Sequence, residues 1–135
     1  MIKFNSETIS NFVNSNIHFL NDIQVAHWQT KSYSQHEGLG EFYTKFNTLN
    51  DRFVETWQGA HNNRILFGAD YKANVINYAD LRDLISRVKA QKVRVTEFAD
   101  YIEGINEKAI LNDIESILED MQEEFSQLLY HLSLQ

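Results

Sequence analysis

The sequence predicts an all-α protein, built as one bundle of four helices. The 135 residues include no proline and only five isolated glycines, so the residues that interrupt helices are almost missing. Apolar side chains recur at steps of three and four along four long stretches, which is the period of an amphipathic helix. The length and the 43% hydrophobic content are typical of one globular domain, which we place over residues 1–135.

The first predicted helix begins at Ser6 and ends at about Lys31, and its apolar stripe leads inward to a polar residue, His27. The stripe consists of Ile9, Phe12, Val13, Ile17, Leu20 and Ile23. A short turn follows. There Ser34 and Glu37 have the spacing of a capping box, so a second helix is expected to start at His36 or just before and to end at about His61.

The stretch from Asn62 to Asn77 has poor periodicity, and we expect it to be a long crossover with apolar anchors at Ile65, Leu66, Phe67 and Val75. A third helix is expected from Leu81 to Ile102, with Gly104 as its C′ residue. Asn106 can cap a fourth helix, which carries an apolar stripe as far as Leu132. This order is the layout of a ferritin-like four-helix bundle with one long crossover between the second and third helices.

Composition excludes several classes of function. The chain has no cysteine, so thiolate metal sites and cysteine nucleophiles are excluded, and any metal must be held by imidazole and carboxylate. A net charge of −7 makes nucleic acid an improbable partner, because binding to phosphates rests on clustered lysine and arginine. No run of apolar residues is long enough to span a membrane, and we expect a soluble cytoplasmic protein.

Four residues form the candidate metal site. His27 ends an inward stripe, His36 opens the second helix, and Asp51 and Glu55 share one face of that helix because they are four residues apart. However, the fifteen residues between His36 and Asp51 correspond to roughly 22 Å of helix, too far for ligands of one ion. We therefore expect two copies to pack antiparallel about a two-fold axis, so that His36 of one lies level with Asp51 and Glu55 of the other.

These residues resemble the miniferritins of the family that protects DNA during starvation (Dps). The resemblance rests on the pair His27 and Trp28, on His36, and on Asp51 and Glu55 at intervals of fifteen and four residues. Lys31 and Tyr33, in the turn, also look like the loop of that family. The chain has no Glu-x-x-His pair, the motif with which ordinary ferritins bind iron inside one bundle.

The resemblance implies a ferroxidase centre between two-fold-related subunits. It implies a dimer within a twelve-subunit shell that oxidises ferrous iron with peroxide or oxygen and stores the product. His27 and His36 would come from one subunit, Asp51 and Glu55 from its neighbour, and Trp28 would lie beside the centre. The resemblance further suggests a short, tail-less bacterial or bacteriophage member, the latter located in the host cytoplasm.

Other interpretations stay open at this point. Imidazole and carboxylate suit manganese or zinc as well as iron. Considered alone, His27 would more often be a core histidine, and Asp51 and Glu55 could be solvated carboxylates. The main alternative is a ferritin-like structural or partner-binding protein without turnover, and a DNA-compacting role is the weakest candidate. Tyr33, Tyr43 and Trp57 are expected to be packing residues, and His18, His61 and His131 surface or capping residues.

Overall fold

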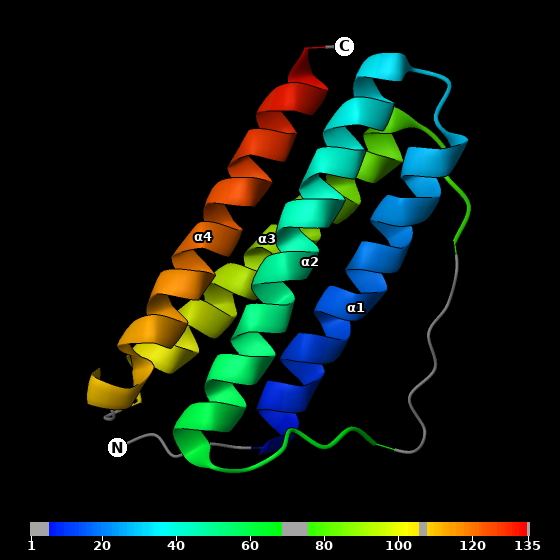
Figure 1. Ribbon diagram of the computed structural model, residues 1–135. Helices are drawn as coiled ribbons and strands as arrows, with labels where there is room; N and C mark the ends of the chain where they lie inside the picture. The colour runs from blue at the N-terminus through cyan, green and yellow to red at the C-terminus, as the bar shows by residue number, and fades with distance from the viewer. Residues whose placement is uncertain (1–5, 69–75, 106–107, 135) are drawn as a thin grey trace.

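The computed structural model describes residues 6–68, 76–105 and 108–134, the side chains of 108–110 excepted. Within these ranges the chain forms four helices and no strand: α1 (Ser6–Gln29), α2 (Tyr33–His61), α3 (Leu81–Glu103) and α4 (Lys108–Ser133). The helices pack as a bundle in which α1 contacts α2 and α3, and α4 contacts α2 and α3 (Figure 1). The predicted all-α four-helix bundle is confirmed.

The core is built from the apolar stripes of all four helices, and aromatic side chains fill much of it. The rings of Phe12 and Phe98 stack with centroids 3.8 Å apart and join α1 to α3. A second group, formed by Phe19, Phe42, Phe46 and Phe125, packs with ring centroids 5.2–6.2 Å apart where α1, α2 and α4 meet. Burying such side chains supplies most of the free energy that holds the helices together.

A polar network crosses the core where three helices meet. Asn16 is fully buried, and its Nδ2 donates to Oδ1 of Asn50 on α2 at 3.1 Å. Gln91 on α3 donates from Nε2 to Oδ1 of Asn16 at 2.9 Å and to Oγ of Ser15 at 3.0 Å. The inward position therefore belongs to Asn16, and Ile17, predicted to lie in the apolar stripe, is 38% exposed.

Several predicted helix ends are corrected. α1 ends at Gln29 rather than near Lys31. Gly104 is the C-cap in a right-handed conformation rather than a C′ residue, because the chain leaves α3 through a tight turn in which the amide of Ile105 donates to the carbonyl of Ile102. The predicted cap Asn106 lies outside the described residues.

The connection between α2 and α3 starts at Asn62, which adopts the left-handed conformation. Residues 69–75 of this connection, including the predicted anchor Val75, lie outside the described part. Ile65 packs against the core, but Leu66 and Phe67 are exposed, so their predicted role as anchors is wrong. Near α3, the amide of Tyr78 donates to Oε1 of Gln29, which places the start of α3 beside the end of α1. No described helix is long and apolar enough to cross a membrane.

Candidate metal centre

The site is built at the tight junction between α1 and α2. Ser32 adopts an extended conformation, and its side chain accepts a hydrogen bond from the amide of Gln35 at 3.2 Å. Ser32 is therefore the N-cap, and the predicted cap at Ser34 is wrong by two residues. Because the reversal takes only three residues, the last turn of α1 lies directly against the first turns of α2.

This junction brings His27 and His36 face to face. Their rings stack with centroids 3.9 Å apart and an interplanar angle of 12°. Nδ1 of His27 lies 2.7 Å from the carbonyl oxygen of His36, and Nδ1 of His36 lies 2.8 Å from the carbonyl oxygen of His27. A carbonyl oxygen only accepts, so each Nδ1 carries the proton and donates. In the neutral ring, Nε2 then keeps its lone pair.

Each ring on its own is oriented as a metal-binding imidazole is, but the two rings are nearly parallel, so their Nε2 lone pairs do not converge on one ion unless a ring turns. Metal-binding histidines usually donate their second ring nitrogen to a carbonyl or carboxylate, which fixes both tautomer and orientation. Both rings line one open hollow of about 430 Å³ on the side of α2. The other residues that line it are Glu37, Gly40, Glu41, Thr44 and Lys45.

Gly40 allows His27 to approach α2 so closely. A Cβ atom at this position would lie 2.8 Å from Cε1 of His27 and 3.2 Å from its Nδ1, both shorter than ordinary contacts. Gly40 was not among the residues that the sequence predicted to shape the site. The available signal was a glycine inside a helical pattern, which often marks a close approach of another group.

The two carboxylates lie elsewhere on the same helix. Asp51 and Glu55 are exposed, as expected of surface positions, and neither lines the hollow beside the histidines. In the described part of a single chain, no group of three or more histidine, aspartate or glutamate side chains is placed to hold a metal ion. One chain thus brings His27 and His36 together, but Asp51 and Glu55 lie away from the two histidines. The site shared between two chains remains a prediction.

A known family matches most of the chain. DUF5856, described as a family of unknown function, matches residues 27–132. The chain belongs to this family. The DUF5856 match begins at His27 and covers all four candidate ligands. No curated protein and no solved structure matches the chain.

Two aromatic side chains flank the histidines of this DUF5856 chain. Trp28 is 66% exposed and Tyr33 is 76% exposed, so the expectation that Tyr33 is a packing residue is wrong. The Tyr33 ring centroid lies 6.5 Å from that of His36. Trp57, by contrast, is buried as predicted and stacks on His61.

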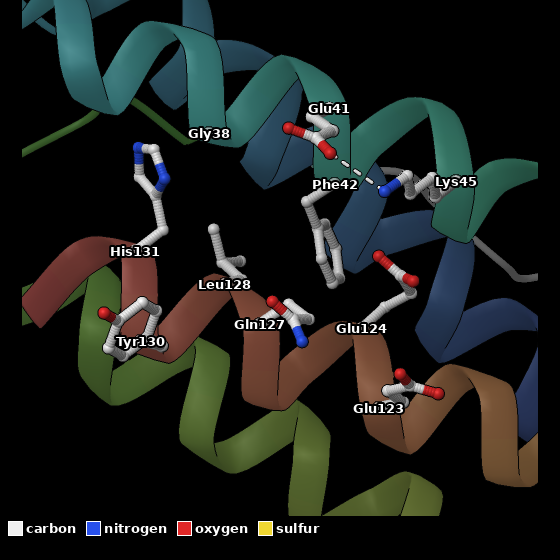
Figure 2. A pocket seen from close by; sticks show the side chains of 10 residues that line it. All are labelled: Gly38, Glu41, Phe42, Lys45, Glu123, Glu124, Gln127, Leu128, Tyr130 and His131. Carbon is white, nitrogen blue, oxygen red and sulfur yellow. Dashed lines mark hydrogen bonds and ion pairs between the residues drawn. The ribbon is translucent and has the colours of Figure 1, made fainter.

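On the α4 side of α2, the DUF5856 chain has a second hollow, of about 360 Å³ (Figure 2). Two residues that line it form an ion pair, in which Lys45 donates to Glu41 at 2.8 Å, and this bond lowers the pKa of Glu41. Burial raises the pKa of Glu124, which faces Lys45 from α4. His131 donates from Nε2 to the carbonyl of Ser34 at 2.6 Å, so it fastens the end of α4 to the start of α2.

Proposed function

We propose that the protein binds ferrous iron as a substrate at a site shared by two copies, and oxidises it. His27 and His36 of one copy and Asp51 and Glu55 of the other are the ligands. The observation that carries the proposal is the pair of stacked imidazoles, each fixed through Nδ1 on a main-chain carbonyl. Nitrogen and oxygen ligands of this kind suit iron, with manganese and zinc as competing ions.

The reaction needs little from the chain beyond binding and charge. Two ferrous ions each give one electron to a peroxide molecule, which takes up two protons and leaves as two waters. Each imidazole can bind ferrous iron through Nε2, and the carboxylates of Asp51 and Glu55 stabilise the added positive charge of the ferric product. Within this proposal the bundle is ferritin-like, with the long crossover between α2 and α3, and the dimer is part of a twelve-subunit shell that stores ferric mineral.

A complementation experiment tests the shared site. One variant carries His27→Ala and His36→Ala, the other Asp51→Ala and Glu55→Ala. Each variant alone lacks half of every site, whereas a mixed dimer has one complete site, made from the histidines of one chain and the carboxylates of the other. We expect little ferrous iron binding by either variant and strong anaerobic binding after the two are mixed, followed by rapid oxidation with peroxide.

The same experiment separates the alternatives. If mixing restores no binding while the parent binds iron, the four residues do not share a site between chains. If the parent itself binds no iron, the ferroxidase proposal fails, and a ferritin-like scaffold that binds a protein partner becomes the better interpretation. The exposed aromatic pair Trp28 and Tyr33 is the feature that favours this alternative. Sedimentation of the parent protein distinguishes a dimer from a twelve-subunit particle.

A further inference from the structure

The outer face of α2, on which the proposed dimer depends, is polar beyond its first turn. From Glu37 to Glu55 its exposed side chains are those of Glu37, Glu41, Thr44, Lys45, Asn47, Thr48, Asp51, Arg52 and Glu55. Two large exposed hydrophobic side chains lie near its start, those of Tyr33 in the first turn and of Trp28 at the end of α1. The rest of the face offers little apolar surface to remove from water, which is the usual driving force for stable association.

Charge also opposes the contact. This face carries four carboxylates, those of Glu37, Glu41, Asp51 and Glu55, against the two cationic side chains Lys45 and Arg52, which is a net charge of −2. Lys45 is already paired with Glu41 in its own chain. In the antiparallel arrangement that brings His36 level with the partner's Asp51, two faces of the same sign meet, with a combined charge of −4.

We propose that divalent metal is the clamp that holds two copies together through α2, so that dimer formation depends on the metal. The inference rests on the proposed shared site but not on iron oxidation. One divalent ion at each of the two equivalent sites supplies a charge of +4, and each ion bonds to both chains. Binding and association are then linked: metal strengthens the dimer, and the dimer raises the affinity for metal by the same factor.

Zinc is the suitable probe because it takes the same ligands without redox chemistry. Sedimentation of a dilution series, with EDTA or with Zn²⁺, gives the dissociation constant of the dimer. We expect Zn²⁺ to lower this constant at least about tenfold, within the usual range of coupling between linked sites. Concentrated NaCl, which only screens charge, should not reproduce the effect.

Two matched double variants separate coordination from charge. Asp51→Asn with Glu55→Gln and Glu37→Gln with Glu41→Gln each remove two negative charges from the same face, but only the first pair removes proposed ligands. The first should abolish the response to Zn²⁺, and the second should keep it.

The inference is overturned if Zn²⁺ binds saturably while the dimer dissociates equally in Zn²⁺ and in EDTA, an outcome that leaves the shared site intact. It is also overturned if the Glu37 and Glu41 pair alone controls the response, because the ion would then lie in the hollow of one chain. Absence of any Zn²⁺ or Fe²⁺ binding by the parent would instead refute the proposed function itself.

Discussion

The imidazole rings of His27 and His36 stack 3.9 Å apart, and each donates from Nδ1 to the main-chain carbonyl of the other residue. The contact is reciprocal, so the orientation of each ring depends on the backbone that carries the other. Both side chains are therefore positioned before any ligand arrives, which lowers the entropic cost of binding. What disturbs one ring should disturb the pair.

Gly40 is expected to control this orientation. In Gly40→Ala, the new methyl group would displace the His27 ring and should lower Zn²⁺ affinity by about 10- to 100-fold, the usual effect of disturbing groups that orient a ligand. Gly38→Ala is the control, because the methyl group there meets His131 instead. Both changes give a similar gain in helix propensity, about 1 kcal/mol. Calorimetric titration with Zn²⁺ measures the affinities, and equal losses in both variants would refute the role of Gly40.

Ser32 is expected to stabilise the start of α2. Ser32→Ala removes the side-chain oxygen that accepts from the amide of Gln35 and should lower the free energy of unfolding by about 1 kcal/mol. Urea unfolding of the variant and of the parent measures the difference. An unchanged free energy of unfolding would show that Ser32 does not cap α2 in solution.

The buried polar network should be costly to break. Asn16→Ala leaves Asn50 and Gln91 without their bonds to this amide, and we expect a loss of about 2–3 kcal/mol in unfolding free energy. Asn11→Ala, an exposed change on the same helix, should stay within about 0.5 kcal/mol of the parent. A double-mutant cycle with Gln91→Ala should show non-additivity. Strict additivity would mean that the two amides do not interact in solution.

Asp22 predicts a dependence of stability on pH. Burial raises the pKa of Asp22 above its ordinary 3.8, although Arg87 and His18 oppose the shift. The folded state then holds the proton more tightly than the unfolded chain, so this stabilisation is present below pH 3.8 and is lost as pH rises through the raised pKa. Asp22→Asn should therefore be more stable than the parent near neutral pH, with the advantage gone in acid.

Urea unfolding of both proteins at about pH 7 and about pH 3 measures this difference. A parent protein that is the more stable of the two at neutral pH would mean that the contact with Arg87, at 3.8 Å, outweighs the burial.

The helices could be predicted because their apolar side chains recur at the helical period, and most of these side chains are the ones buried in the bundle. What periodicity could not predict is which side chain turns inward where the stripe is ambiguous. Ile17 fits the stripe, yet Asn16 is the buried residue, because its partners Asn50 and Gln91 come from distant segments. The cap moved from Ser34 to Ser32 for a similar reason, since two serines in one turn offer the same local chemistry.

The turn of three residues between α1 and α2 brings His27 and His36 together in one chain. The crossed bonds to the carbonyls and the fit against Gly40 depend on how two helices pack, which spacing along the chain does not encode. The proposed relation of both histidines to Asp51 and Glu55 would require a second chain, and one folded copy cannot test it.

The amides of Asn16, Asn50 and Gln91 also bear on how the bundle avoids misfolding. Apolar stripes with a regular period are nearly self-similar, so two helices could slide past each other by one turn, about 5.4 Å, and still bury similar surface. Such a slip would separate the three amides and bury them among phenylalanine rings, each without its partner. The hydrogen bonds among these amides form only when α1, α2 and α3 are in the native register, so the network destabilises packings in which a helix is shifted.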